Sequence, residues 1–173
     1  MSEKLILDAC CGGRMFWFDK EHQNAIYVDN RTYDGELCDG RRFIVRPDVV
    51  ADFRDLPFPD ESFYMVVFDP PHLVRAGDDS WLRAKYGVLK DSWKQDLKYG
   101  FSECMRTLKP HGTLIFKWNE CQISKKELLA AIGARPIIGN RRGKTIWMVF
   151  MKGLRCEDCG ECPLYTEEAD LDG

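Results

Sequence analysis

Several short apolar runs in this chain end in an aspartate, and this repeated pattern restricts the fold more than any other feature of the sequence. The first four runs are ILD, AIYVD, DVVAD and FYMVVFD, which end at residues 8, 29, 52 and 69, and the third run extends as DVVADFRD to Asp55. Runs of this length, rich in Val, Ile, Phe and Tyr, predict buried β-strands. Two further runs, GTLIFKWNE and KTIWMVFMK, predict strands later in the chain.

Helical patterns separate these strands. The segment DSWKQDLKYGFSECMRTL repeats apolar residues at spacings of three and four, and SKKELLAAIG carries a capping box formed by Ser124 and Glu127, with Gly133 just past its end. Strands that alternate with helices predict an α/β fold with a doubly wound, mostly parallel sheet. The last two apolar pieces, ARPIIG and KTIWMVFMK, are joined by NRRG and predict an antiparallel hairpin at the C-terminal edge.

Length and composition predict one folded domain, residues 1–153, followed by a cysteine cluster and an acidic tail, residues 154–173. No apolar stretch reaches membrane-spanning length and MSEKLILDACC lacks the layout of a signal peptide, so we expect a cytoplasmic protein with reduced cysteines. Beyond Arg155 the tail holds seven acids and no Lys or Arg, which leaves 25 basic against 21 acidic residues in the body. This balance is compatible with a polyanionic substrate.

The acids at the strand ends, Asp8, Asp29, Asp52 and Asp69, indicate the class of ligand. In open α/β sheets, ligands bind beyond the carboxyl ends of the strands. A row of carboxylates there repels nucleotide phosphates and favours a ligand with hydroxyls, an amine and a positive charge. S-adenosylmethionine has all three, so Asp29 is predicted to accept from its ribose hydroxyls, and Asp52 with Phe53 to border its adenine.

Two segments that look like phosphate loops do not fit that role. The first turn, DACCGGR, is not the G-x-G-x-x-G that accepts a pyrophosphate. The segment GNRRGKT has a spacer one residue too short for a P-loop, and it precedes a predicted strand instead of a helix. Both nucleotide interpretations are therefore rejected.

The motifs LDACCGG, VDN, ADF and FDPPH, in this order, resemble those of class I S-adenosylmethionine-dependent methyltransferases. DPPH is similar to the D-P-P-[YFW] motif of amino-methyltransferases, chiefly N6-adenine enzymes, and the resemblance spans about residues 4 to 152. RMFWFDK and IFKWNE also resemble segments of small phage or prophage methyltransferases. The resemblance implies a Rossmann-like methyltransferase fold that binds S-adenosylmethionine. It implies eight cofactor-binding residues: Asp8, Ala9, Cys10, Gly12, Asp29, Asn30, Asp52 and Phe53.

The first turn departs from the family pattern at two positions. Gly12 keeps the central glycine, where the backbone approaches the methionine part of the cofactor. Cys10 stands where the family has Phe or Gly, and Arg14 replaces the last Gly. These departures concern the shape of the turn more than its role.

The DPPH motif implies a mechanism for methyl transfer to a planar amine. By resemblance, the Asp69 carboxylate and the Pro70 carbonyl accept the hydrogens of the amine, which turns the nitrogen lone pair towards the methyl group. Pro71 fixes its own φ and so keeps the Pro70 carbonyl aimed. His72 stands at the aromatic position that stacks on the target base. An imidazole could instead contact a phosphate, or be a turn residue in water.

Residues 73–92 form the only sizeable insertion beside the DPPH motif and are the candidate region for target recognition. They contain basic and aromatic residues interleaved: Arg75, Trp81, Arg83, Lys85, Tyr86 and Lys90. This mixture suits phosphate contact with base stacking, and equally a lid packed over the pocket. Lys117, Asn119 and Glu120 follow the strand expected beside DPPH, where they either border the target pocket or form a polar strand end.

The sequence favours adenine in DNA or RNA as the acceptor and leaves two alternatives open. One is a methyltransferase for a protein amide or a small-molecule amine. The other is a methyltransferase-fold binding module that is weakly active or inactive. A chain this small offers little surface for reading a long site, so a homodimer or a separate specificity subunit would supply the rest.

The cysteine cluster CEDCGEC places Cys156, Cys159 and Cys162 at three-residue spacings, the local geometry of zinc ligands. Cys38 or His111 could supply a fourth ligand. The alternative is a tail of unliganded thiols, because half of a zinc motif is a weak signal.

Overall fold

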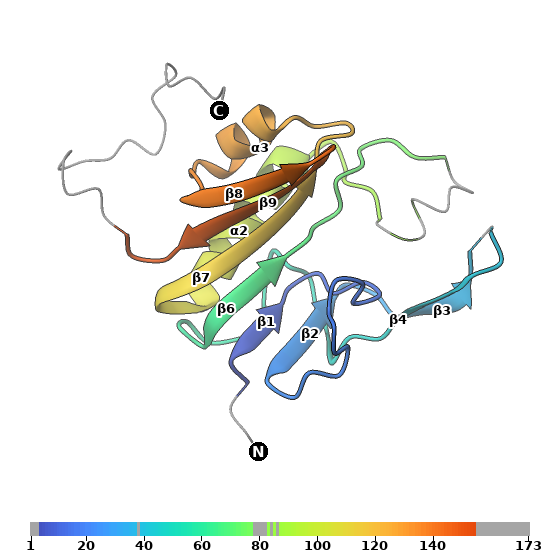
Figure 1. Cartoon of the computed structure of the whole chain (residues 1–173), viewed down its shortest axis with the longest axis horizontal. Helices are drawn as coiled ribbons and strands as arrows, with labels where there is room; N and C mark the ends of the chain where they lie inside the picture. The colour runs from blue at the N-terminus through green and yellow to red at the C-terminus, as the bar shows by residue number, and fades with distance from the viewer. Residues whose placement is uncertain (1–3, 38, 78–82, 84, 86, 155–173) are drawn as a thin grey trace.

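The computed structural model describes residues 4–37, 39–77, 83, 85 and 87–154. It is built on a seven-stranded sheet with the order β5-β2-β1-β6-β7-β9-β8 (Figure 1). The strands of this sheet, in chain order, are β1 (Ile6–Asp8), β2 (Ala25–Asp29), β5 (Val49–Val50), β6 (Phe63–Phe68), β7 (Leu108–Asn119), β8 (Ile138–Arg142) and β9 (Thr145–Met151).

Strand directions match the predicted fold class. The strands from β5 to β7 pair in parallel, whereas β9 runs antiparallel to both β7 and β8. The mostly parallel Rossmann-like sheet and the antiparallel hairpin at its C-terminal edge are therefore confirmed. On one side of β1 the sheet continues with β2 and β5, and on its other side it continues with β6 and β7, so the order of the strands reverses between β1 and β6. A ligand crevice is expected at this switch point, beyond the carboxyl ends of β1 and β6.

Two helices, α2 (Trp93–Thr107) and α3 (Lys125–Ile132), lie together on one face of the sheet, behind it in Figure 1. Leu97 and Phe101 of α2 and Leu128 of α3 pack into one apolar cluster with the sheet. The predicted capping box begins α3, where the Ser124 side chain accepts from the Glu127 N–H, and Gly133 ends the helix in the left-handed conformation.

On the opposite face, residues 9–24 between β1 and β2 form a succession of turns. Trp17 from this segment packs against a small buried cluster made by Cys11, Ala25 and Tyr27. This turn-rich segment therefore covers β1 and β2, and it brings the first turn of the chain to the carboxyl end of the sheet.

Two local features differ from the sequence prediction. The strand expected in DVVADFRD shortens to the two residues of β5. Residues 33–45 form an unpredicted antiparallel hairpin of β3 (Tyr33–Glu36) and β4 (Arg42–Val45), which extends away from the main sheet in Figure 1. Alternate residues of RFIV are buried, which explains why this segment forms β4: Phe43 and Val45 pack in one apolar cluster with Leu37.

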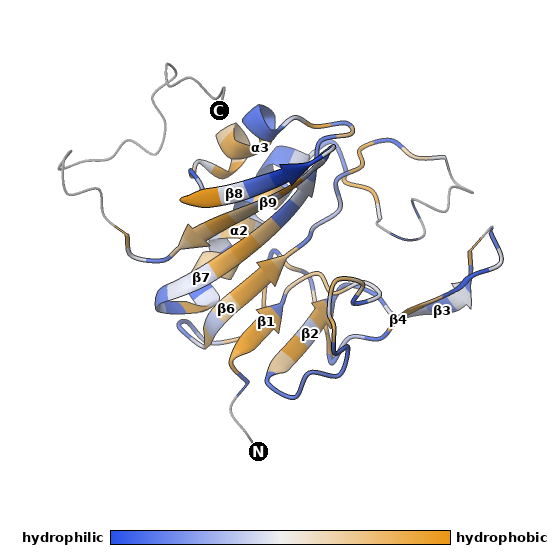
Figure 2. Ribbon diagram, in the orientation of Figure 1, coloured by the Kyte–Doolittle hydropathy of each residue, from blue (hydrophilic) through white to orange (hydrophobic). Residues whose placement is uncertain are grey.

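The core follows the hydropathy of the strands. Figure 2 shows β1 and β6 as mainly hydrophobic ribbons at the centre of the sheet, whereas the ribbon of β3 is pale. The largest buried side chains include Trp118, Phe68 and Phe116, which belong to the apolar cluster formed by the sheet and the two helices. Within the described residues, no helix is both long and apolar enough to cross a membrane.

Candidate active site

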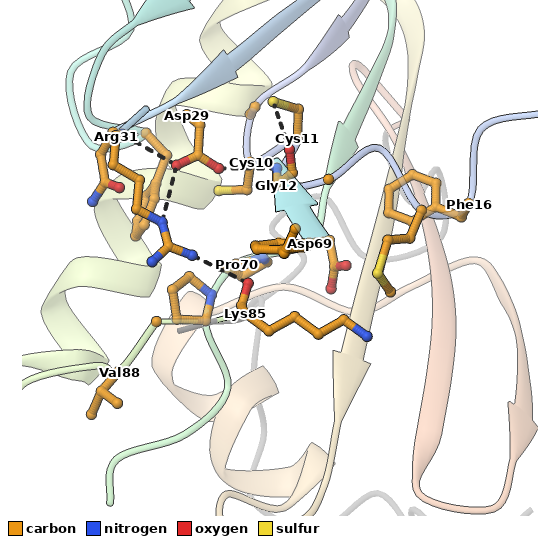
Figure 3. Close-up of a pocket in the computed structure, with 18 of the residues that line it drawn as sticks. Cys10, Cys11, Gly12, Phe16, Asp29, Arg31, Asp69, Pro70, Lys85 and Val88 are labelled. Atoms are coloured by element: carbon orange, nitrogen blue, oxygen red, sulfur yellow. Dashed lines mark hydrogen bonds and ion pairs between the residues drawn. The ribbon is translucent and has the colours of Figure 1, made fainter. Parts of the chain in front are cut away.

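A cavity of about 260 Å³ lies at the carboxyl end of the sheet, and most of the predicted site residues line it (Figure 3). The predicted residues in its wall are Ala9, Cys10, Gly12, Asp29, Asn30, Phe53, Asp69, Pro70 and Pro71. They come from four segments that are far apart in the sequence. The fold thus brings the first turn, the end of β2, the segment after β5 and the DPPH motif to one place.

The first turn is tied to the end of β2. The Gly12 N–H donates to Asp29 Oδ2 at 3.0 Å, and Gly12 has φ +47°, a conformation that glycine adopts more readily than other residues. Burial raises the pKa of the Asp29 carboxyl, and the hydrogen bond from Gly12 partly offsets this rise. The retained central glycine therefore shapes the turn around the carboxylate predicted to bind ribose.

Asp8 lies beneath the turn and is fully buried, so it does not line the cavity. Its carboxylate accepts a 2.7 Å hydrogen bond from Trp17 Nε1 and a 3.3 Å bond from the Cys10 N–H. Burial raises the pKa of Asp8 to about 7. In this structure Asp8 holds the turn from below, and a direct contact with the cofactor stays a prediction.

Cys10, which is partly buried, and Cys11, which is buried, are better described as small packing residues than as reactive thiols. Both line the cavity, and burial raises the pKa of each thiol above its usual value. A thiol with a raised pKa remains protonated and is a weak nucleophile at neutral pH. Neither cysteine forms a disulfide in the structure.

Asp69 follows β6 directly and points into the region between the cavity and β7. Its Oδ2 atom accepts a 2.5 Å hydrogen bond from Lys117 Nζ, which also forms an ion pair with it. Burial raises the pKa of Asp69, whereas the Lys117 ammonium lowers it. Phe68 of β6 and Phe116 of β7 are direct partners in the parallel pairing. Asp69 follows Phe68 and Lys117 follows Phe116, so this register sets Asp69 and Lys117 next to each other.

His72 and Asp52 lie outside the cavity lining. The His72 side chain is buried, its ring centre lies 6.4 Å from Trp118 in an edge-on arrangement, and burial lowers its pKa to about 4. The Asp52 carboxylate accepts from Arg54 Nε at 2.9 Å and from Nη2 at 2.6 Å. The neighbouring Phe53 lines the cavity, whereas Asp52 does not. Of the two residues predicted to border adenine, the aromatic one therefore faces the cavity. Stacking by His72 stays a prediction.

The candidate recognition region is described only in part, because residues 78–82, 84 and 86, including Trp81 and Tyr86, lie outside the described residues. Lys85, Gly87 and Val88 close one side of the cavity. Arg31 Nη2 donates to the Lys85 carbonyl at 3.2 Å, which joins this side to the end of β2 (Figure 3). These contacts are the kind expected if residues 73–92 form a lid over the pocket.

Several residues of the site were not predicted from the sequence. Phe16, Arg31 and Phe43 line the cavity, and Arg14 anchors the turn-rich segment from inside. Arg31 directly follows the VDN motif, and this position is the sequence signal that could have identified it. Phe43 could not be placed because the hairpin of β3 and β4 was not predicted, and no sequence motif marks Phe16 as a cavity residue.

The predicted zinc ligands Cys156, Cys159 and Cys162 lie outside the described residues. Over the part of the chain that is described, no group of three or more His, Cys, Asp or Glu side chains could hold a metal ion. Zinc binding by the tail therefore stays a prediction.

Comparison with known proteins supports the fold and not a closer identity. No family model matches the sequence. No curated protein matches it either. Among solved structures, the PH0226 protein of Pyrococcus horikoshii is similar over 87% of this chain and 82% of its own, with a TM-score of 0.57 and 17% identity. A SAM-dependent methyltransferase from Methanosarcina mazei is similar over 90% and 95% of the two chains, with a TM-score of 0.50 and 13% identity. The chain has the Rossmann-like fold of S-adenosylmethionine-dependent methyltransferases.

Proposed function

We propose that this protein is an S-adenosylmethionine-dependent N-methyltransferase that acts on a planar exocyclic amine, adenine N6 in DNA or RNA. The observation that carries the proposal is that Asp69 and Pro70 line the same cavity as Gly12 and Asp29. The acceptors for an amine and the residues for the cofactor thus meet at the switch point of a methyltransferase fold. The similarity to the Methanosarcina mazei enzyme supports the choice of cofactor.

The lining of the cavity fits S-adenosylmethionine. The Asp29 carboxylate stands at the end of β2, where it can accept from ribose hydroxyls, and Ala51 with Phe53 provides an apolar wall for a flat adenine ring. The backbone of the turn at Cys10 and Gly12 faces the remaining space, which suits the methionine part. When bound, this cofactor supplies an electrophilic methyl group on a positively charged sulfur.

The DPPH motif then positions the amine. The Asp69 carboxylate and the Pro70 carbonyl accept its two hydrogens, so the nitrogen lone pair points at the methyl carbon. As the new nitrogen–carbon bond forms, the carbon–sulfur bond breaks with its electron pair left on sulfur, and one amine proton leaves to Asp69 or to water. Alignment of reactants of this kind contributes roughly 7–11 kcal/mol, so Asp69 need not be a strong base.

The acceptor is proposed to be nucleic acid because basic residues line the cavity and follow the DPPH motif. Arg31 and Lys85 line the cavity, and Arg75 is exposed on the segment that follows DPPH. A chain with so small a recognition region suits a single-stranded or flipped-out base. A homodimer or a specificity subunit is proposed to supply any longer contact with the target.

The first experiment measures cofactor binding by calorimetry. Wild-type protein is expected to bind S-adenosylmethionine, and Asp29→Asn is expected to bind about tenfold or more weakly because a charged acceptor is lost. Asp34→Asn is the matched control, since Asp34 lies on the exposed hairpin and pairs with Arg42. Absence of binding by the wild-type protein would contradict the proposed function.

The second experiment measures transfer of a labelled methyl group to DNA, RNA and protein, followed by nucleoside analysis. N6-methyladenine is the expected product. Asp69→Ala is expected to reduce transfer on the order of 100-fold or more, with cofactor affinity retained because Asp29 and Gly12 are unchanged. Label recovered only in protein would replace the proposed acceptor with an amide, and normal turnover by Asp69→Ala would overturn the mechanism.

A further inference from the structure

The Lys117 ammonium occupies a defined position beside the proposed reaction site. It donates to Asp69 Oδ2 at 2.5 Å, and its side chain keeps 20% of its area exposed. Two aromatic rings flank it, with Nζ 5.6 Å from the centre of Phe16 and 5.9 Å from that of Trp147. The two rings themselves meet edge to face at 5.5 Å.

Three separate elements hold this arrangement, so the ammonium is fixed and not a loosely placed surface charge. Lys117 and Trp147 are direct partners in the antiparallel pairing of β7 with β9. Phe16 comes from the turn-rich segment and lines the cavity. Asp69 comes from the end of β6. A donor is thereby placed immediately beside the carboxylate that the amine would approach.

The pairing of Asp69 with Lys117 puts an acceptor and a donor next to each other on the protein. A substrate edge that matches it carries a donor next to an acceptor, such as an amine flanked by a ring nitrogen. A positively charged amine does not match, because it would meet the ammonium of Lys117 as a like charge. This edge distinguishes an aromatic amine of a base from an alkylamine.

We propose that Lys117 is a specificity-determining residue that donates a hydrogen bond to the ring nitrogen beside the amine, while Asp69 accepts from the amine itself. In adenine this nitrogen is N1 on the Watson–Crick edge. The inference rests on the proposed function and deepens it, because it states which feature of the base is read. The Phe16 ring, which lies beside Lys117 and lines the same cavity as Asp69, provides an apolar wall for a flat base at this place.

The test compares a single-stranded oligonucleotide that contains one adenine with the same oligonucleotide that contains 1-deazaadenine, which keeps the amine and lacks N1. An oligonucleotide with 7-deazaadenine is included because N7 flanks the amine on the other side. Wild-type protein is expected to lose roughly ten- to hundredfold in kcat/KM on the 1-deaza substrate, the usual effect of removing a hydrogen bond to a charged group. The 7-deaza substrate is expected to be methylated at nearly the rate of adenine.

Lys117→Met keeps the unbranched apolar stem of the side chain and removes the ammonium donor. Its activity falls on every substrate because Asp69 loses its partner, so the informative quantity is the ratio of rates on adenine and 1-deazaadenine. This ratio is expected to approach one in Lys117→Met and to remain high in Lys117→Arg. Lys109→Met is the control, since Lys109 lies on the same strand with its Nζ 4.1 Å from the centre of the Tyr64 ring, and it is expected to keep the wild-type ratio.

The outcomes separate the inference from the proposed function. Wild-type protein that methylates adenine and 1-deazaadenine equally well would overturn the role of Lys117 and leave the methyltransferase intact. The role of Lys117 would also be overturned if Lys117→Met still preferred adenine over 1-deazaadenine. It would equally be overturned if the wild-type protein discriminated against 7-deazaadenine and not against 1-deazaadenine. Failure of the wild-type protein to methylate any adenine would overturn both.

Discussion

The guanidinium carbon of Arg14 lies 3.6 Å from the centre of the Tyr27 ring, so the side chain of the turn-rich segment stacks on β2. The same guanidinium donates to the carbonyl of Arg46 at 2.8 Å and to the Glu21 carboxylate at 3.0 Å. Arg14 is buried and has φ +52°. A single arginine thereby holds a segment without a helix against the sheet, next to the first turn.

We expect Arg14→Ala to lower the free energy of unfolding by about 2–4 kcal/mol, because several carbonyl and carboxylate acceptors lose a buried partner. Arg14→Gly removes the same contacts and relaxes the positive φ, so it should be less destabilising by about 1 kcal/mol. Urea denaturation of both variants measures the difference. Arg41→Ala, which breaks an exposed ion pair with Asp39, is the control and should change stability by less than about 1 kcal/mol. Equal stability of the wild type and Arg14→Ala would contradict the anchoring role.

Asp8 makes stability depend on pH. Burial raises the pKa of Asp8 in the folded protein from its usual value of 3.8 to about 7, so between these two values the folded protein keeps a proton that the unfolded chain has released. The contribution is fully present below about pH 4 and is lost as the pH rises towards 7, on the order of a few kcal/mol. Asp8→Asn keeps an acceptor for Trp17 and cannot ionise. Relative to wild type, this variant should therefore become more stable as the pH rises from 4 to 8.

Thermal denaturation across that pH range checks the prediction for Asp8. Asp91→Asn, at an exposed position just before α2, is the control and should follow the wild-type curve. A constant difference in stability between wild type and Asp8→Asn at all pH values would show that Asp8 does not change its protonation on unfolding.

The pH profile of methyl transfer should report the ion pair of Asp69 with Lys117. Activity requires the carboxylate, so kcat/KM falls as the pH drops through the pKa of Asp69, which burial raises above its usual value. The Lys117 ammonium opposes this rise. Lys117→Met should therefore move the acid limb of the profile to higher pH, whereas Lys109→Met should leave it in place. A limb that stays at the same pH in Lys117→Met would contradict the electrostatic role of the ion pair.

The sequence was sufficient where a local pattern and its chemistry coincide. Acids that follow apolar runs placed Asp29 and Asp69 at one edge, since the carboxyl ends of parallel strands meet there. The sequence was insufficient where the position of a side chain depends on packing between segments that are far apart in the chain. Asp52 also follows a strand, yet the arginine two residues later binds its carboxylate and the chain turns it away from the cavity. The pairing of Asp69 with Lys117 depends on the register of β6 with β7, which no single segment encodes.

Gly100 in the middle of α2 shows how the helix layer shapes the cofactor cavity. A Cβ atom at this position would lie 2.4 Å from Cδ2 of Phe53 and 2.8 Å from Cζ of Phe68. The rings of Phe53 and Phe68 meet edge to face, with their centres 5.4 Å apart, and Phe53 lines the cavity. Gly100→Ala should therefore push Phe53 towards the proposed adenine position, although alanine is intrinsically the better helix former.

We expect Gly100→Ala to lower the free energy of unfolding by about 1–3 kcal/mol through overpacking, and to weaken S-adenosylmethionine binding. Ser102→Ala, at an exposed position of the same helix, is the control and should leave both quantities nearly unchanged. Urea denaturation and calorimetry measure the two effects separately. The substitution leaves Asp29 and the first turn unchanged. Weaker S-adenosylmethionine binding would therefore be explained by displacement of the Phe53 ring, which forms a wall of the cavity. Unchanged affinity in a destabilised Gly100→Ala protein would instead show that the cofactor does not use this wall.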